Sequence, residues 1–468
     1  MTDPTMDDRG EEPPEETGIE GAHWLGLVDG FLRTTPSAEA REAASRVTAD
    51  VLAAIVAGSR FDDYHRTWST VELPDGDATV LGTDRTTEAV HAAVLNGTAA
   101  IAQESEEGHN TGGHVGAGIV AGAFASAEEY DVDGAVLVDA VAKSYELCTR
   151  LEHALFTLKA RINDDSPWLI RDPHSTWTTV GPAVATALVA HPSGSSAMDA
   201  FLLGANRSVV SMFDPYREGP PSRNLTAGAS AATGVLVGKL ATSGFRGSAS
   251  TIQRIYEPFE TLVDGGFTAR FDELGSRWTI TEAYFKPYPS CRYTHPALDA
   301  LRDLDAEVSP DEVTAIEVET FANAVDMDHR HPTTPTGAKF SIPYVLATYL
   351  HRGIPTFEDF SPEAIEDPAV QATADGITLR IDEDFERRFP EDWGARVHVV
   401  FADGRTESAA RRYPRGDYRD PISDEAFIDR LEATLAVGLS ATDHRSAAEA
   451  LLDVNNRSAR DVGDQLQG

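Results

Sequence analysis

Cysteine is almost absent from this sequence, since Cys148 and Cys291 are the only two in 468 residues. One possible pair cannot cross-link a chain of this length, so we exclude a disulfide scaffold and expect a reducing cytoplasm. No run of about 20 apolar residues occurs, which excludes a membrane-spanning helix and a membrane partner. The N-terminus also lacks a basic region followed by an apolar run, so no signal peptide is expected.

Positive charge is also scarce: 39 Lys and Arg stand against 76 Asp and Glu, a net charge of −37. Such a surface repels nucleic-acid phosphates, so we expect no nucleic-acid partner. An acidic surface with very little lysine suits concentrated salt, which screens self-repulsion, and this favours a halophilic protein. The lysines are Lys143, Lys159, Lys239, Lys286 and Lys339. A lysine retained on such a chain is a candidate for proton transfer, which arginine does not perform.

The length predicts about two domains of roughly 100–200 residues each. Residues 1–21 are acidic and contain almost no large apolar groups, so we expect a disordered tail. From about residue 24 to 271 the patterns are mostly helical. One helix is expected between Ser37, a candidate N-cap, and Gly58, a candidate residue just beyond the C-terminus. Two more are expected over 134–155 and 227–240.

From about residue 283 to 420 the hydrophobic period changes. Apolar and polar residues alternate over 316–319, 377–381 and 396–399, which predicts half-buried strands. Helices are expected around 296–304 and 342–350. Near residue 421 a helical pattern returns, and Ser423 with the acidic residues after it indicates a helix start. The sequence therefore predicts a mainly α protein with an α+β segment inserted before its last helices.

A proline-rich loop at 286–295, KPYPSCRYTH, is the most unusual segment. Its two spaced prolines bar regular helix and stiffen the loop. The loop brings Lys286, Cys291, Arg292 and His295 close together, and cations and proton donors on a stiff loop suit recognition of a multi-anion. The alternative is a structural turn between domains that leaves Arg292 on the surface.

An acidic loop at 104–114 places carboxylates and histidines together, from Glu104 to His114, ahead of a helix rich in small residues. Histidine titrates near neutrality, so general acid–base chemistry is the favoured interpretation. A metal site is the weaker interpretation, because the spacing matches no specific metal motif. A third possibility is a flexible acidic loop in which a histidine caps the helix.

Two further segments carry candidate groups. His174 precedes a helical pattern that begins near Thr178, where it would act either as a cap or as part of an anion site. Lys339 and Tyr344 flank a predicted helix start, although a lone tyrosine is more often a packing residue than a catalytic one.

These segments, in this order, resemble the MmgE/PrpD family over about residues 24–435. The most specific match is 286–300, KPYPSCRYTHPALDA, which is nearly identical to the family's signature. Four weaker pieces occur in the family's order, at 95–100, 144–150, 338–344 and 414–416. The family includes 2-methylcitrate dehydratase, cis-aconitate decarboxylase and carboxylate epimerases.

The resemblance implies a fold, a site and an assembly. It implies a large all-helical domain formed by 22–282 and 421–468, a smaller α+β lid at 283–420, and an active site between them. It also implies a homodimer, a small polycarboxylate substrate, and no metal or organic cofactor.

By position, the resemblance gives active-site roles to His114, His174, Lys286 and Tyr344. His295 lies within the family's signature, and Cys291 stands where some members have histidine. The sequence departs from the family in its acidic loop, where Glu104 begins a Glu-Ser-Glu-Glu-Gly run in place of an Asp-x-Asp-Asp-Thr run. It departs again where an expected lysine is Arg223, which binds anions but cannot act as a neutral base.

The resemblance and the residue types together predict a cofactor-independent hydro-lyase of the 2-methylcitrate dehydratase type. Removing water beside carboxylates needs cations on the carboxylates, one base and one acid. We expect Lys286, Arg223 and Arg292 to bind carboxylates, and His114 and His174 to exchange protons in an order that stays open. Glu104, Cys291, His295, Lys339 and Tyr344 are expected to position the substrate or relay protons. Decarboxylation, epimerisation and non-catalytic carboxylate binding are the alternatives, with a metal-dependent hydrolase more distant.

Overall fold

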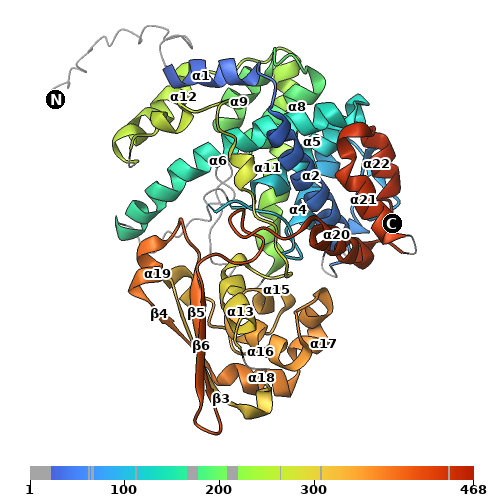
Figure 1. Ribbon diagram of the computed structural model, residues 1–468. Helices are drawn as coiled ribbons and strands as arrows, with labels where there is room; N and C mark the ends of the chain where they lie inside the picture. The colour runs from blue at the N-terminus through green and yellow to red at the C-terminus, as the bar shows by residue number, and fades with distance from the viewer. Residues whose placement is uncertain are drawn as a thin grey trace, which may run out of the picture.

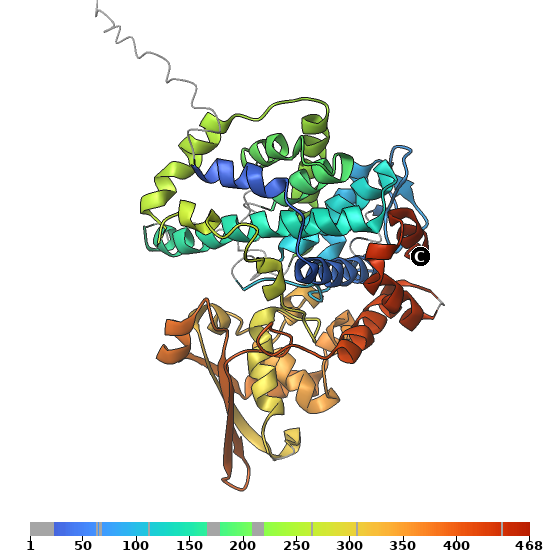
Figure 2. The same cartoon turned by 45° about the horizontal axis from the view of Figure 1, so that its top comes forward.

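The computed structural model describes residues 23–61, 64, 68–110, 113–165, 178–207, 220–263, 265–305, 308–440 and 443–468 (Figure 1). The predicted tail and His174 lie outside the described residues. The chain is mainly helical with small sheets, as predicted. A helical body lies above a smaller part that combines helices with a four-stranded sheet (Figures 1 and 2).

The body is built from helices of both chain ends. Its N-terminal helices are α1 (His23–Leu32), α2 (Ala38–Gly58), α4 (Ala89–Ala100), α5 (Val115–Tyr130), α6 (Gly134–Asp165), α8 (Val180–Ala190), α9 (Ala197–Ala205), α11 (Leu225–Thr242) and α12 (Ala249–Tyr256). A short ribbon joins β1 (Ala78–Thr79) to β2 (Thr86–Thr87), and single 3-10 turns are η2 (Pro221–Asn224), η3 (Glu257–Thr261), η4 (Thr268–Phe271) and η5 (Thr279–Glu282).

Small residues let the body's helices approach closely. A side chain at Gly234 of α11 would meet Pro182 of α8 at 2.4 Å, so α8 and α11 touch almost backbone to backbone. Gly58 belongs to the same pattern. Helix α2 begins after Ser37, whose side chain accepts from Ala40 N as predicted, but it includes Gly58 instead of ending before it. A Cβ at Gly58 would lie 2.0 Å from Ala99 O, so this glycine permits contact with α4 and was misassigned as a terminator.

Helix α6 is longer than predicted. It runs from Gly134 to Asp165, about ten residues past the expected end. Neither glycine nor proline interrupts the sequence between Leu155 and Pro167, so nothing there stops a helix. The result is a helix of about 48 Å at 1.5 Å per residue, which crosses the whole body (Figure 2).

The smaller part contains a mixed sheet of order β4-β3-β5-β6. Its elements are η6 (Arg292–Thr294), α13 (His295–Arg302), η7 (Pro310–Glu312), β3 (Val313–Thr320), α14 (Ala322–Val325), α15 (Pro335–Lys339), α16 (Ile342–Arg352), η8 (Phe357–Phe360), α17 (Pro362–Ile365), α18 (Pro368–Asp375), β4 (Ile377–Ile381), α19 (Glu383–Arg388), β5 (Ala395–Phe401) and β6 (Thr406–Arg411). Strand β3 pairs in parallel with β4 and antiparallel with β5. The predicted alternation holds on β3 and β5, where Ile316, Val318 and Val397 are buried on one face, but it fails at the end of β4, where Ile381 is exposed.

The last helices return to the body, where α20 lies beside α2 (Figure 1). They are α20 (Asp424–Gly438), α21 (His444–Leu452) and α22 (Ala459–Gln465), with η9 (Val454–Asn456) between the last two. Ser423 caps α20 by accepting from Ala426 N. Phe427 and Leu431 join the body's core, whereas residues of 284–401 form a second core of their own.

Two expected absences concern membranes and disulfides. Among the described helices, none combines the length and the apolarity needed to cross a lipid bilayer. Cys148 and Cys291 are both buried thiols without a disulfide bond. Each lies in a different core, so each acts as a small packing residue.

Candidate active site

The acidic loop of the body meets the proline-rich loop of the smaller part where the two cores join. The ammonium of Lys286 lies 2.9 Å from Glu104 Oε2 and 3.4 Å from Glu106 Oε1. Arg223, in η2 just before α11, brings its Nη1 to 2.5 Å from Glu104 Oε1. All four side chains are almost fully buried. Residues 180 positions apart in sequence therefore form one buried charge cluster, which we call the carboxylate–lysine cluster.

Backbone geometry aims Glu104 at these cations. Glu104 adopts a left-handed conformation with φ 53°, which a residue with a Cβ rarely takes. Four residues later, Gly108 exchanges both backbone hydrogen bonds with Tyr284. A Cβ at Gly108 would meet the Tyr284 hydroxyl at 2.4 Å. The missing threonine of the family pattern is thus explained, since the ring of Tyr284 occupies the space that a threonine side chain would need.

His114 stands at the edge of the cluster, at the N-cap position of α5. Its Nδ1 lies 2.8 Å from the backbone oxygen of Glu107 and 3.1 Å from Glu106 Oε1. The ring meets Tyr284 edge to face, with centroids 6.4 Å apart. The imidazole is therefore held in one orientation by the acidic loop beneath it.

A cavity of about 30 Å³ lies against this cluster. Its polar wall consists of Glu104, His114, Arg223 and Arg292. Its other wall consists of Tyr284, Cys291, Tyr293, Met327, Phe340 and Trp393. This volume holds about one water molecule, so a six-carbon polycarboxylate requires the two parts to separate. The arrangement suits an anion that also presents an apolar surface.

The carboxylates of the acidic loop do not titrate alike. Burial disfavours the charge of Glu104, but Arg223 and Lys286 outweigh burial and hold its pKa below the ordinary value. Burial, together with the charge of Glu104, raises the pKa of Glu106 against the opposing effect of Lys286. Burial raises the pKa of Glu107 to about 8, although Tyr145 donates to it at 2.8 Å. Glu104 is thus ionised and Glu107 protonated at neutral pH.

Lys339 and Cys291 are also shifted by burial. Desolvation lowers the pKa of Lys339 to about 7, so this lysine can exchange a proton near neutrality. Its ammonium donates to Gln103 O at 3.1 Å and to Pro289 O at 3.3 Å, and lies 4.4 Å from the Phe360 ring. Burial raises the pKa of Cys291 to about 12, so its thiol stays neutral. Cys291 therefore offers a weak donor to the cavity and no base.

Arg292 and His295 brace the proline-rich loop. Arg292 Nη1 donates to Arg415 O at 2.8 Å, and its guanidinium lies 4.4 Å from the Tyr284 ring. His295 bonds Ser290 O through Nε2 at 3.1 Å, so Nε2 carries the proton and Nδ1 accepts from Arg292. Burial and the charge of Arg292 keep the pKa of His295 well below its ordinary value. His295 is thus a neutral structural link, away from the cavity wall.

Tyr344 is not brought to the cluster. It lies in the first turn of α16, fully buried in the second core, and its hydroxyl donates to Asp359 O at 2.6 Å. The ring is directed into the core because the helix packs that face inward. Tyr344 therefore does not line the candidate site, although the resemblance placed it there. His174 lies outside the described residues.

Metal binding is the alternative role for this cluster. Ligand atoms of Glu104, Glu106 and His114 lie within 4.8 Å of one another. Lys286 and Arg223 already contact those carboxylates, so a divalent ion would meet two positive charges at close range. A second triad, Glu317, Glu319 and His398, is likewise paired with arginines of the sheet. In both groups, the carboxylates are already paired with lysine or arginine, which leaves them poorly suited to bind a divalent metal ion.

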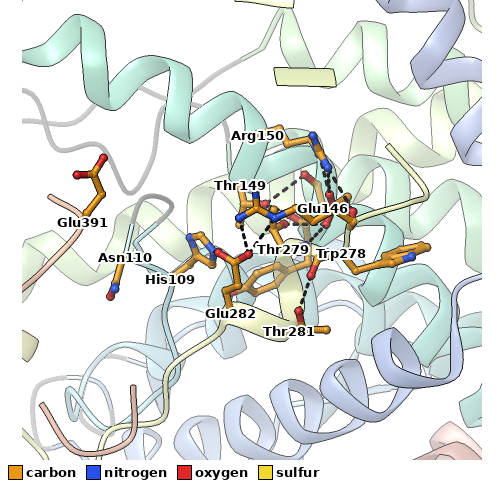
Figure 3. A network of polar contacts seen from close by, with 12 residues as sticks. His109, Asn110, Glu146, Thr149, Arg150, Trp278, Thr279, Thr281, Glu282 and Glu391 are labelled. Carbon is orange, nitrogen blue, oxygen red and sulfur yellow. Dashed lines mark hydrogen bonds and ion pairs between the residues drawn. The ribbon is translucent and has the colours of Figure 1, made fainter. Parts of the chain in front are cut away.

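A second buried ion cluster lies between α6 and residues 270–279 (Figure 3). Glu146 Oε1 pairs with Arg150 at 2.6 Å, while Oε2 accepts from Thr279 N at 2.6 Å and from Thr279 Oγ1 at 2.7 Å. Arg150 also donates to the backbone oxygens of Arg270 and Arg277. A cavity of about 270 Å³ adjoins it, with His109 on its wall. This network, the α6 anchor, fixes residues 270–279 ahead of Lys286.

Sequence reasoning missed Glu106 and Tyr284. The sequence did hint at Glu106, because it lies two positions from the candidate Glu104 in the same non-helical acidic loop. Tyr284 lies two residues before Lys286, but nothing in its surroundings distinguishes it from a core tyrosine. Met327, Phe340 and Trp393 were equally hidden, since an apolar cavity wall has the composition of a core.

Comparison with known proteins covers most of the chain. A model of the MmgE/PrpD N-terminal domain matches residues 27–269, and a model of the MmgE/PrpD C-terminal domain matches residues 288–455. The chain is also similar to a cis-aconitate decarboxylase-like protein of Aspergillus oryzae, with 24% identity over 404 residues that cover 80% of each chain. Lys286 and Tyr284 lie in the short connection between the two matched segments.

Proposed function

The chain belongs to the MmgE/PrpD family, and we propose that it is a cofactor-independent lyase that removes water from a small polycarboxylate such as 2-methylcitrate. The observation that carries the proposal is the position of Glu104. Its carboxylate lies between Arg223 and Lys286, at 2.5 and 2.9 Å, and all three side chains are almost fully buried. A place that already holds one carboxylate between two buried cations has the chemistry to hold a substrate carboxylate.

The chemistry follows from where charge develops. Removal of the proton beside a carboxylate leaves an electron pair on carbon, which delocalises into that carboxylate. Cations near the carboxylate stabilise this state more than the ground state, because the charge grows there. Lys286, Arg223 and Arg292 supply that field. His114 exchanges the carbon-bound proton, and a second group, predicted to be His174, protonates the departing hydroxyl.

Decarboxylation of cis-aconitate is the second candidate, favoured by the printed name of the Aspergillus oryzae relative. Loss of CO₂ leaves the same carbanion, which a protonated group then quenches. One site can therefore serve either reaction, and the difference lies in which bond is held in line with the developing π system. Epimerisation of an imino-dicarboxylate uses the same carbanion and remains a third member of this set.

A panel of substrates with NMR detection tests the proposal. 2-Methylcitrate, cis-aconitate and iminosuccinate are incubated separately with the protein in buffer of high salt, and products are followed by ¹³C signals. Methylaconitate from methylcitrate supports dehydration, whereas ¹³CO₂ from labelled cis-aconitate supports the second candidate. Tight binding of all three without any turnover would reject both, and would leave a carboxylate-binding protein. The Lys286→Ala variant serves as the control for adventitious activity.

We also propose a homodimer in a salt-rich cytoplasm. Leu225, Leu236 and Leu240 are exposed along α11, which supports an apolar contact with a second copy. Light scattering across a range of KCl concentrations tests both parts. A monomer at all concentrations, or stability that falls as KCl rises, would contradict them.

A further inference from the structure

His114 is bound through one nitrogen to two oxygen atoms. Nδ1 lies 2.8 Å from Glu107 O and 3.1 Å from Glu106 Oε1. A peptide oxygen can only accept a hydrogen bond, so Nδ1 must donate, whatever the ionisation of Glu106. In the neutral ring the proton is therefore on Nδ1, and Nε2 keeps its lone pair.

Glu106 is placed to hold this tautomer. Its side chain has no exposed surface. The same oxygen, Oε1, contacts both His114 Nδ1 and the ammonium of Lys286, the latter at 3.4 Å. Its other oxygen, Oε2, finds no hydrogen-bond partner among the described residues. The carboxylate orientation is thus set by His114, which lines the cavity, and by Lys286, which is buried beside it.

The charges around His114 come from several elements. Glu104 and Glu106 approach from the acidic loop, Lys286 from the proline-rich loop, and Arg223 from η2. Tyr284 presents its ring edge. The two carboxylates favour a positive imidazole and the two cations oppose it, so the negative charge nearest to Nδ1 has the largest effect. That charge belongs to Glu106.

We propose that Glu106 is a positioning residue, which works with the backbone oxygen of Glu107 to hold His114 through its Nδ1–H, so that Nε2 is the base of the reaction. The inference rests on the proposed lyase function. Nε2 takes the proton from the carbon beside the carboxylate, and the C–H electron pair becomes the C=C bond. The C–O bond to the adjacent carbon breaks with its electron pair, and a second acid protonates the hydroxide. Glu106 then lies 3.1 Å from the Nδ1–H of an imidazolium, which its negative charge stabilises.

The chain offers a matched pair of variants for a test. Glu106 and Glu107 are adjacent, both fully buried, and both become nearly isosteric amides as Glu106→Gln and Glu107→Gln. The side chain of Glu107 bonds Tyr145, and only its backbone touches His114. We expect Glu106→Gln to lower kcat on the order of 100-fold or more with little change in KM, as loss of a histidine-orienting carboxylate does elsewhere. Glu107→Gln should keep kcat near wild type.

The pH profile separates positioning from a structural role. Without the carboxylate the imidazolium is less stable, so the acid limb of kcat should move to lower pH in Glu106→Gln. In Glu107→Gln the acid limb of kcat should lie at the same pH as in the wild type. Thermal unfolding of both variants checks that they fold. Equal losses in both variants, or an unmoved limb in Glu106→Gln, would overturn the proposal.

The tautomer is measurable without any substrate. ¹⁵N chemical shifts of His114, assigned with His114→Gln, report which ring nitrogen carries the proton. We expect a protonated Nδ1 and an unprotonated Nε2 in both the wild type and Glu106→Gln, because the backbone oxygen of Glu107 stays in place. A proton on Nε2 in the wild type would refute the inference even if the lyase activity is found. The expected shifts in a protein that turns over none of the substrates would instead refute only the function.

Activation by added Zn²⁺ that chelation reverses would make Glu106 a ligand and also overturn the proposal.

Discussion

The α6 anchor and the carboxylate–lysine cluster are both buried ion clusters, yet they are completed in different ways. In the anchor, both oxygens of Glu146 and the guanidinium of Arg150 are bonded to side chains and backbone of the body. In the cluster, Glu106 Oε2 and Arg292 Nε nearby find no hydrogen-bond partner among the described residues. Buried polar groups are normally satisfied, so the cluster keeps bonding capacity that a ligand can use. On the proposed function, this difference in completeness separates the structural ion cluster from the one that binds substrate.

Arg150→Met provides the largest expected effect, and it falls on stability. The substitution leaves Glu146 buried without its cation, which costs about 3–5 kcal/mol of unfolding free energy. Turnover per folded molecule should be unchanged, because no residue of the anchor lines the 30 Å³ cavity beside the carboxylate–lysine cluster. Denaturant unfolding and kcat measured on the same sample check both halves. A large fall in kcat with intact stability would erase the distinction between the two clusters.

Lys286→Ala should mainly lower turnover, whereas Arg150→Met should mainly lower stability. It removes the cation that contacts Glu104 and Glu106, and we expect turnover to fall at least about a hundredfold. Lys239→Ala is the matched control, because Lys239 is a partly exposed lysine paired with Glu129 far from the cavity. Steady-state rates of the two variants decide the matter. Near-wild-type turnover in Lys286→Ala would remove the lysine from the chemistry.

The acidic loop should also make stability depend on pH, through Glu107. Glu107 has a folded-state pKa of about 8 against 4.5 when unfolded, because burial favours its neutral form. Its contribution is full below pH 4.5 and is lost as pH rises towards 8, since the native state binds more protons in this window. We expect Glu107→Gln to remove up to about 1 kcal/mol per pH unit of this decline. Urea unfolding at pH 5, 6.5 and 8 measures it, and an unchanged slope would show that Glu107 is ionised.

Arg223→Lys should produce the smallest change. The charge beside Glu104 is kept, but the planar guanidinium that lies 5.4 Å from the Phe340 ring is lost. We expect kcat/KM to change by less than about tenfold, mainly through KM, because both cations bind a carboxylate. Comparison with Arg223→Met, which removes the charge, isolates the electrostatic part. A loss in Arg223→Lys as large as in Arg223→Met would mean that guanidinium geometry matters more than charge.

Local patterns predicted most of the fold. Alternation at Ile316 and Val318 identified β3, and the cap residues Ser37 and Ser423 located two helix starts. Strand β6 escaped, because its residues are polar or small and half-exposed on the sheet edge. Gly58 was misassigned because sequence cannot distinguish a glycine needed for a turn from one needed for helix contact.

The site was harder to predict because its contacts join distant segments. The composition of the two loops predicted the candidates Lys286 and His114, and the resemblance added Arg223. No periodicity could show that Glu106 would touch both Lys286 and His114. Tyr344 illustrates the reverse case, since a position matched by resemblance points into a core when the helix is built. Burial determines both the contacts of Glu106 and the direction of Tyr344, and burial is known only once the chain is folded.

The left-handed backbone of Glu104 links the shape of the loop to the occupancy of the site. This conformation costs roughly 1 kcal/mol or more in a residue with a Cβ, and the carboxylate bonds to Arg223 and Lys286 hold it in place. A substrate carboxylate that takes over those cations releases Glu104 from its only side-chain restraints of this kind. On the proposed function, that release would let the Glu104 peptide leave its left-handed conformation, so the shape of the loop that carries His114 would depend on whether the site is occupied.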